Sequence, residues 1–539
     1  MPLRDRFSDR EAHLSPSADF RSDPDQPRTA IWPRVCVLLV LVLLVRGLVY
    51  PVNEYLSGDA VSRVELAERW AKSPHVIRSF GDGAAQYGPL QLYLVGVTLK
   101  WIPREEAAKL VNLVFGVLTV IPIFMLTRRY FGVRAATWAC LGLSVWSLHI
   151  QLSTTGGSEA LALFLMWTAL AFFAGGLARP SVLPFAASAV AMNLAAATRY
   201  DAWMYIPLLG VMPALMWRDL RAGAGWGALF VLLCLPYPLF WMAGNAAAHG
   251  NAFYPFTYIN DFHRMWVASE THAWGALWFR LQGLGFWPAI ALITLSPGVA
   301  ILGAIGMFTA VRTAPATRWL VASALIPATY YALRTALFID FVPLARFTVL
   351  QVSLLLPFIA LGVSRLPEWL AAPARQRALR ATVALAVLTP VALGAYAEFV
   401  PHSSAEVVES VGPTSTNRPS LMAAAHYVRD TVVRAHASVA LDEDATYQDI
   451  QLGFYGRVDE TTVLRLRWRQ FREQFERHPT DFVVLFARGR LLQEPWVHAD
   501  GARLTIGGSV YDEVLDFDGA VRVFRRRTAS ARVGAGPLR

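Results

Sequence analysis

Charged residues are scarce in this sequence. They make up 16% of the 539 residues, whereas soluble domains average about 25%. This shortage excludes an ordinary soluble protein, and the 55% hydrophobic content and the mean hydropathy of +0.39 indicate a membrane protein. Apolar runs of about 18 residues or more recur between residues 34 and 397, and runs of that length can cross a bilayer.

Cysteines and nucleotide-binding motifs are also rare. The three cysteines, Cys36, Cys140 and Cys234, fall in apolar runs, so the C-terminal region cannot contain a disulfide framework. No Walker-type or Gly-x-Gly-x-x-Gly loop supports an ATP-driven pump. Asp442-Glu443-Asp444 and Asp516-Phe517-Asp518 match the Asp-x-Asp pattern of soluble nucleotide-sugar transferases. Both fall in a predicted exported domain, and we interpret them as turns at strand ends.

The net charge of +10 would suggest a nucleic-acid partner in a soluble protein. Here the arginines lie mostly in short loops between apolar runs, so we interpret them as a topology signal and predict no nucleic-acid partner. The predicted cytoplasmic segments contain many more arginines than the short external segments. The latter contain only Arg199, Arg264, Arg280, Arg334 and Arg346. We therefore expect the N-terminus in the cytoplasm and the C-terminus outside.

These patterns predict a polytopic α-helical membrane protein of the inner membrane, with about eleven transmembrane helices and a C-terminal soluble α/β domain in the periplasm. The predicted spans are 34–51, 107–126, 135–152, 160–177, 182–198, 203–217, 226–243, 286–311, 317–333, 345–363 and 380–397. The other predicted parts are a disordered cytoplasmic arm (1–33), a large first external loop (52–106), a linker (398–419), the periplasmic domain (420–525) and a basic tail (526–539).

Within the large loop, Tyr87-Gly88-Pro89-Leu90 opens an apolar stretch that ends near Ile102. This stretch is too short to span comfortably, and a span here would move the arginine-rich segment 128–134 outside. We expect a helix that lies on, or dips into, the outer face of the membrane.

The sequence after residue 418 alternates helix and strand patterns. We predict helices at 418–434 and 467–477, strands at 438–441, 461–466 and 482–486, and a hairpin at 511–523 with its turn at Asp518-Gly519.

Two acidic residues at predicted outer ends of spans are candidates for chemistry. Asp59 follows the first span in Ser57-Gly58-Asp59-Ala60, where it can cap a helix and can also act as a base. Glu159 lies between the third and fourth spans, where an acid favours the start of a helix. Carboxylates this close to a bilayer are also typical of functional sites.

Four features, in this order, resemble the C-type (GT-C) glycosyltransferase superfamily, and within it the protein O-mannosyltransferase and aminoarabinose transferase group (glycosyltransferase family 39). They are Gly58-Asp59 after the first span, Tyr87-Gly88-Pro89-Leu90, the Leu-x-x-Arg-Tyr-Phe-Gly loop at 126–132, and Glu159 outside the third span. The resemblance covers residues 34–210 well and the later spans by arrangement. Relatives often have Asp-Glu where Ala60 follows Asp59 here, and frequently Asp in place of Glu159.

The resemblance implies inverting transfer of a sugar from a polyprenyl-phosphate donor to a protein, lipid or glycan acceptor at the outer face of the membrane. A hydroxyl acceptor needs a general base, and we predict Asp59 in that role. Glu159 is the second predicted catalytic residue: it either binds a divalent cation with Asp59 or orients the acceptor, and the sequence leaves both open.

The departing lipid phosphate needs fixed positive charge, which arginine supplies well. We therefore predict that Arg199, Arg334 and Arg346 bind the donor, together with Arg63 and Tyr87. Each arginine could instead extend its head to the lipid headgroups.

The aromatic-rich loop 245–286 suits either sugar stacking or the membrane interface. Two other functions also remain open, a flippase for a lipid-linked sugar and a non-catalytic envelope assembly protein.

Overall fold

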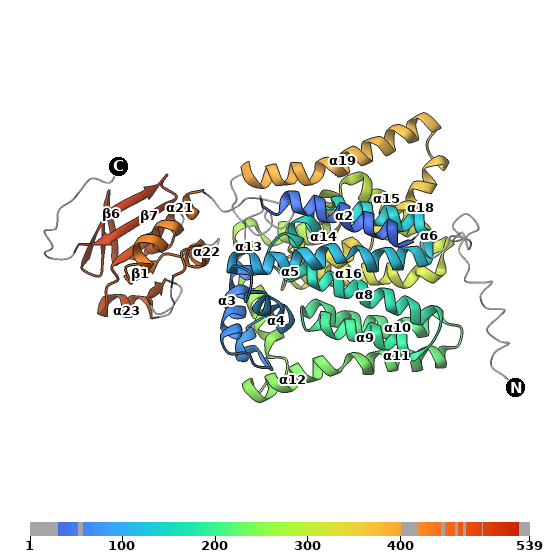
Figure 1. The fold of residues 1–539 in the computed structure, drawn as a ribbon, viewed down its shortest axis with the longest axis horizontal. Helices are drawn as coiled ribbons and strands as arrows, with labels where there is room; N and C mark the ends of the chain where they lie inside the picture. The colour runs from blue at the N-terminus through green and yellow to red at the C-terminus, as the bar shows by residue number, and fades with distance from the viewer. Residues whose placement is uncertain are drawn as a thin grey trace. The chain divides into compact units, whose positions relative to one another are not determined.

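The chain divides into two compact units (Figure 1). The helical unit contains the described residues 31–51 and 63–399, and the C-terminal unit contains the described residues from 419 on together with the short segment 58–62. The predicted arm, linker and basic tail lie outside the described residues apart from their edges. This computed structural model describes residues 31–51, 58–399, 419–443, 448–458, 462–466, 470–487 and 489–527.

The part of the chain before residue 400 is almost entirely helical. Its longer helices are α2 (Ile31–Val49), α3 (Gly58–Lys72), α4 (Pro89–Thr98), α5 (Arg104–Leu118), α6 (Val120–Val145), α7 (Ser147–Ser153), α8 (Glu159–Ala178), α9 (Val182–Ala196), α10 (Tyr205–Met216), α11 (Leu220–Cys234), α12 (Pro236–His249), α13 (Tyr254–Trp274), α14 (Ala276–Thr294), α15 (Pro297–Thr313), α16 (Arg318–Leu333), α17 (Val349–Ser353), α18 (Ile359–Arg365) and α19 (Ala372–Phe399). Short turns of helix include η3 (Phe80–Ala84), η4 (Tyr200–Met204), η6 (Arg334–Phe338) and η7 (Ala345–Thr348).

Among the described residues, seven helical segments are long and apolar enough to cross a membrane, and a bent helix pair would add an eighth. The seven are Ile31–Val49, Arg104–Val145, Glu159–Ala178, Ala276–Thr294, Pro315–Phe338, Ala345–Arg365 and Ala372–Tyr396. The helices α9 and α15 are apolar but shorter. The chain is thus a multi-pass helical membrane protein with a separate α/β unit, as the sequence predicts. The predicted number of about eleven spans exceeds the seven or eight described segments that are long and apolar enough to cross.

Three predicted spans are interrupted. The predicted span 135–152 crosses the break at Trp146, where α6 ends and α7 begins. The predicted span 286–311 is divided between α14 and α15, because Ser296 has a φ of 71° and Pro297 starts a new helix. The predicted span 226–243 crosses a 47° bend between α11 and α12, where Pro236 is the first residue of α12. The predicted short helix after Tyr87 is present as α4, with Gly88 before it and Pro89 at its first position.

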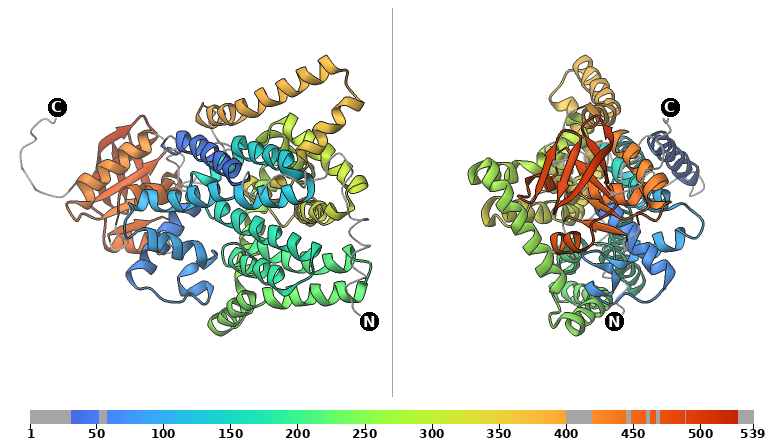
Figure 2. Two further views of the ribbon diagram at one scale, coloured as in Figure 1. Left: turned by 45° about the vertical axis from the view of Figure 1, so that its right-hand side comes forward. Right: turned by 90° about the vertical axis from the view of Figure 1, so that its left-hand side faces the viewer.

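Helix α8 lies at the centre of the bundle. It packs along α9 and against α5 and α6 (Figures 1 and 2), and most of its side chains are buried. The indole of Trp167 donates to Ser353 Oγ at 2.9 Å, which ties α8 to α17. By contrast α19 lies along the outside of the bundle in both figures, and Ala386 is its only buried side chain among residues 372–396.

A buried arginine that the sequence analysis did not single out joins α2 to the break between α6 and α7. Arg46 donates to the carbonyl oxygens of Leu143 (3.0 Å) and Ser144 (3.2 Å), where α6 ends, and to Ser153 Oγ (3.1 Å) at the end of α7. Its Nη2 lies 2.6 Å from His149 Nδ1. Carbonyl groups at a helix end lack helical partners, so Arg46 serves as an internal cap that fixes α7.

The C-terminal unit contains one seven-stranded sheet with the order β2-β1-β3-β7-β6-β5-β4. Strands β2, β1 and β3 pair in parallel, and the remaining pairs are antiparallel. Its elements are α21 (Pro419–Tyr427), η10 (Val428–Val433), β1 (Val439–Leu441), α22 (Gln448–Tyr455), β2 (Val463–Arg465), α23 (Phe471–Arg477), β3 (Phe482–Phe486), η11 (Leu491–Gln493), β4 (Val497–Asp500), β5 (Arg503–Ile506), β6 (Ser509–Phe517) and β7 (Val521–Arg526).

The three predicted strands and the hairpin at 511–523 are present in this unit. Asp518 and Gly519 have φ values of 53° and 69°, as the predicted turn requires. The predicted helix at 467–477 is α23, which begins at Phe471. The sequence analysis missed β4, β5 and α22. The Asp442 carboxylate accepts hydrogen bonds from the backbone N–H groups of Glu443, Phe486 and Leu491, which agrees with its interpretation as a turn residue.

Candidate active site

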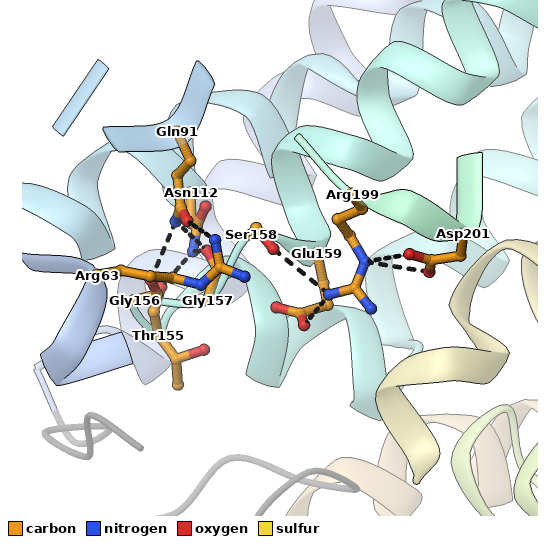
Figure 3. A network of polar contacts seen from close by, with 10 residues as sticks. All are labelled: Arg63, Gln91, Asn112, Thr155, Gly156, Gly157, Ser158, Glu159, Arg199 and Asp201. Carbon is orange, nitrogen blue, oxygen red and sulfur yellow. Dashed lines mark hydrogen bonds and ion pairs between the residues drawn. The ribbon is translucent and has the colours of Figure 1, made fainter. Parts of the chain in front are cut away.

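The loop between α7 and α8 is held by two buried side-chain amides. Gln91 of α4 donates through Nε2 to the carbonyl oxygens of Gly156, at 3.0 Å, and of Gly157. Asn112 of α5 donates through Nδ2 to the carbonyl oxygens of Thr155, at 2.6 Å, and of Gly157. Figure 3 shows both amides directed at the loop. Two glycines in succession give this loop little rigidity of its own, so these amides determine its conformation.

Glu159 follows this loop, in the first turn of α8, and is 5% exposed. Its Oε1 forms an ion pair with Arg199 Nη1, while Arg199 Nε donates to both carboxylate oxygens of Asp201 at 3.0 and 3.1 Å (Figure 3). A Cβ atom at position 157 would overlap Glu159 Oε2. A larger residue at position 157 would therefore require the Glu159 carboxylate to shift.

Arg63 and Tyr87, both predicted to bind substrate, lie against each other. The Arg63 Cζ atom is 4.0 Å from the centre of the Tyr87 ring, and both side chains are buried. Arg63 Nη1 also donates to Gln91 Oε1 at 3.0 Å. The Tyr-Gly-Pro sequence fits here because Gly88 contacts the end of α9, where a Cβ atom would overlap the carbonyl oxygen of Ala197.

Arg346 of η7 shares the surroundings of Glu159. The positive charges that act on the Glu159 carboxylate are those of Arg199, Arg346 and Arg63. The guanidinium carbons of Arg199 and Arg346 lie 5.7 and 5.6 Å from the centre of the Phe347 ring. The charges of three of the four predicted donor-binding arginines thus act on the same carboxylate, and one of the three, Arg199, is in direct contact with it.

Arg334 belongs to a neighbouring group. Its Nε pairs with Asp340 at 3.0 Å and its Nη2 donates to Asn260 Oδ1 at 3.0 Å. His263 of α13 is buried next to this group, stacks on Phe341 with ring centres 4.4 Å apart, and accepts a hydrogen bond from the Val342 N–H.

Burial and the charges of Arg334 and Arg346 lower the pKa of His263 to about 4, so this imidazole is neutral at neutral pH.

Asp59 lies in the first turn of α3, half-buried, four residues before Arg63. That spacing corresponds to about one helical turn, so the predicted base and the predicted cation share one helix. The meeting of Asp59 with Glu159 stays a prediction.

A divalent cation does not fit Glu159 well. Within the described ranges, no group of three or more His, Cys, Asp or Glu side chains could hold a metal ion. The Glu159 carboxylate is paired with Arg199 and acted on by two further guanidinium groups, and nearby positive charge repels a cation. Of the two roles predicted for Glu159, the arrangement favours orientation over metal binding.

Solved structures share this fold. ArnT from Cupriavidus metallidurans in the apo state matches with a TM-score of 0.62 and 14% identity, over 92% of this chain and 98% of that chain. The Archaeoglobus fulgidus oligosaccharyltransferase in complex with Zn and sulfate matches with a TM-score of 0.53 and 12% identity, over 84% and 68%. Its apo form gives 0.53 and 13%, over 84% and 69%. No protein-family model matches the sequence, and neither does any curated protein.

These matches show that the chain shares the fold of ArnT and of the archaeal oligosaccharyltransferase, which agrees with the fold that the sequence motifs predicted. The likeness to ArnT extends over nearly the whole of both chains, which includes the helical unit and the C-terminal unit.

Proposed function

We propose that this protein is a glycosyltransferase that moves a sugar from a polyprenyl-phosphate donor to an acceptor at the outer face of the inner membrane. The observation that carries the proposal is the group of Arg63, Arg199 and Arg346 around Glu159, inside a GT-C fold. Guanidinium groups suit a phosphate ligand, because they donate paired, charge-assisted hydrogen bonds to its oxygens.

In the proposed reaction, the acceptor oxygen attacks the anomeric carbon on the face opposite the lipid phosphate. The bond between the anomeric carbon and the phosphate oxygen breaks, and the electron pair leaves with the polyprenyl phosphate. Asp59 takes the proton of the acceptor hydroxyl. Arg63 and Arg346 stabilise the charge of the leaving phosphate, and Glu159, held by Arg199, orients the acceptor. The configuration at the anomeric carbon is inverted.

The chemical class of the acceptor stays open between protein, lipid and glycan. A structure of the Archaeoglobus fulgidus oligosaccharyltransferase tethered with an acceptor peptide has a similar fold, with a TM-score of 0.51 and 11% identity. In our proposal the C-terminal unit lies outside the cytoplasm, as the arginine distribution predicts, on the side where the acceptor is bound.

The proposal is tested with purified protein in proteoliposomes and radiolabelled polyprenyl-phosphate sugars. Envelope extracts serve as acceptors, and mass spectrometry identifies the product. Asp59→Asn should abolish transfer while expression and membrane insertion stay normal. Transfer by that variant at the wild-type rate would remove Asp59 as the base. Movement of a fluorescent lipid-linked sugar across the bilayer, without covalent transfer, would support a flippase instead.

A further inference from the structure

Gln91 contacts two parts of the candidate site at once. Its Oε1 accepts from Arg63, and its Nε2 donates to the carbonyl oxygens of Gly156 and Gly157, next to Glu159 (Figure 3). Gln91 is fully buried, although it lies on a short apolar helix. A buried polar group on such a helix is costly unless its hydrogen bonds are satisfied, and here both ends of the amide have partners.

We propose that Gln91 is a positioning residue for the transfer reaction, one that fixes the cation Arg63 and the Glu159 loop relative to each other. The inference rests on the proposed function, because it assigns Gln91 a role in that reaction. Arg63 lies one turn after Asp59 on α3, so the Arg63–Gln91 contact also holds the helix that carries the predicted base.

Only a carboxamide of this length meets both demands. The oxygen must accept from a guanidinium group, and the nitrogen must donate to two backbone carbonyl groups. Glutamate would keep the contact with Arg63 but would place an acceptor against two carbonyl oxygens. Asparagine is one methylene shorter and cannot reach both partners from the same backbone position.

A second amide restricts the same loop from another helix. Asn112 of α5 donates to Gly157, the carbonyl oxygen that Gln91 also contacts. Since the two amides share this acceptor, their effects on the loop are coupled, and substitutions at the two positions should not add.

A positioning role predicts a specific kinetic signature. A displacement of about 1 Å at a reacting group can cost about 100-fold in rate, whereas the Gln91 variants leave every guanidinium group of the proposed donor site in the protein. We expect Gln91→Glu to lower kcat by about 10- to 100-fold, with the KM for the lipid-linked donor within about twofold of wild type. Gln91→Asn, which adds no charge, should fold and should lower kcat in the same way.

Asn193 of α9 offers a matched control in the same unit. It too is an amide that bridges two helices, donating to the carbonyl oxygen of Leu233 at 3.0 Å and accepting from the Tyr237 N–H at 2.9 Å. Asn193→Asp makes the same chemical change as Gln91→Glu, at an amide whose partners are Ala189, Leu233 and Tyr237 and not the Glu159 loop. We expect it to leave kcat unchanged.

Hydrogen–deuterium exchange of the peptide 153–159 gives a measurement that does not need transfer activity. Exchange should accelerate in Gln91→Glu and Gln91→Asn and stay at the wild-type rate in Asn193→Asp. If wild-type protein transfers no sugar, the proposed function fails, and exchange still tests whether Gln91 holds the loop.

Two results would overturn the inference. One is a wild-type exchange rate of this peptide in both Gln91 variants. The other is a loss of kcat in Asn193→Asp as large as in Gln91→Glu, which would show a general structural effect.

Discussion

The carboxylate of Glu159 and the guanidinium of Arg199 form a buried ion pair between the start of α8 and the segment that follows α9. Arg199 pairs with Glu159 through Nη1 and with Asp201 through Nε. One planar guanidinium group therefore fixes the positions of two carboxylates. A buried pair of this kind adds little net stability, but removing one partner leaves an uncompensated charge. The pair therefore makes position 199 sensitive to the shape of the cation as well as to its charge.

Replacing Arg199 with lysine should separate these two properties. Lysine keeps the charge but has a single ammonium group, which cannot hold Glu159 and Asp201 in the two-sided arrangement. We expect transfer to fall at least about tenfold, whereas Arg199→Ala should also lower the free energy of unfolding by about 3–5 kcal/mol. Thermal unfolding and steady-state kinetics of the two variants test this. Wild-type kinetics in Arg199→Lys would contradict it.

Arg346→Ala should weaken donor binding. Loss of one phosphate-binding cation is expected to raise the KM for the polyprenyl-phosphate sugar about tenfold, equivalent to about 1.4 kcal/mol. Arg264→Ala is the matched control, because Arg264 is 65% exposed and pairs with Asp261 at the surface. Equal KM values in the two variants would remove Arg346 from the donor site.

Arg46→Met should destabilise the helical unit. Methionine preserves volume but removes the hydrogen bonds that Arg46 donates to the carbonyl groups of Leu143 and Ser144 and to the Ser153 hydroxyl. Hydrogen bonds from a charged group contribute about 1.5–3 kcal/mol each. We expect a lower unfolding temperature in detergent. Arg312→Met, where the arginine is exposed, should leave that temperature unchanged, and a similar fall in both variants would exclude a specific role of Arg46.

The pKa of His263 predicts a dependence of stability on pH. Its pKa is lowered to about 4 in the folded protein, whereas an unfolded histidine titrates near about 6.5. The unfolded state therefore takes up a proton first as the pH falls, and the His263 contribution to stability, present above about pH 6.5, is lost between about pH 6.5 and 4.

His263→Gln should show a smaller loss of stability than wild type over this range, when unfolding temperatures are compared at pH 7 and pH 4.5. Identical losses in the two proteins would show that the imidazole is not the group that titrates.

Much of the architecture can be predicted from local sequence. The apolar runs predict the helices, and Asp518-Gly519 predicts the hairpin turn, because each signal acts within a few residues. Pro297 is also a local sequence signal for the break between α14 and α15, because proline often begins a new helix. The hydropathy of residues 286–311 does not change at this break, so hydropathy alone predicts a single span.

The interior of the site was predicted only in part. Glu159, Arg199 and Arg346 were singled out from the sequence because ionisable residues near a bilayer are unusual. Gln91 and Asn112 were missed because their partners are backbone carbonyl groups 43 to 66 positions away, and no residue type marks such acceptors. Arg334 was grouped with Arg346 because of its position in the chain, yet it pairs with Asp340.

The outer position of α19 has a consequence for sequence variation. Side chains such as Val387, Leu388 and Val391 are more than half exposed, and in a bilayer their neighbours would be fluid acyl chains, which impose no particular shape. Any apolar side chain should be tolerated at these positions of α19. Substitutions should therefore accumulate there faster than in α8, where tightly packed neighbours restrict the size of each side chain.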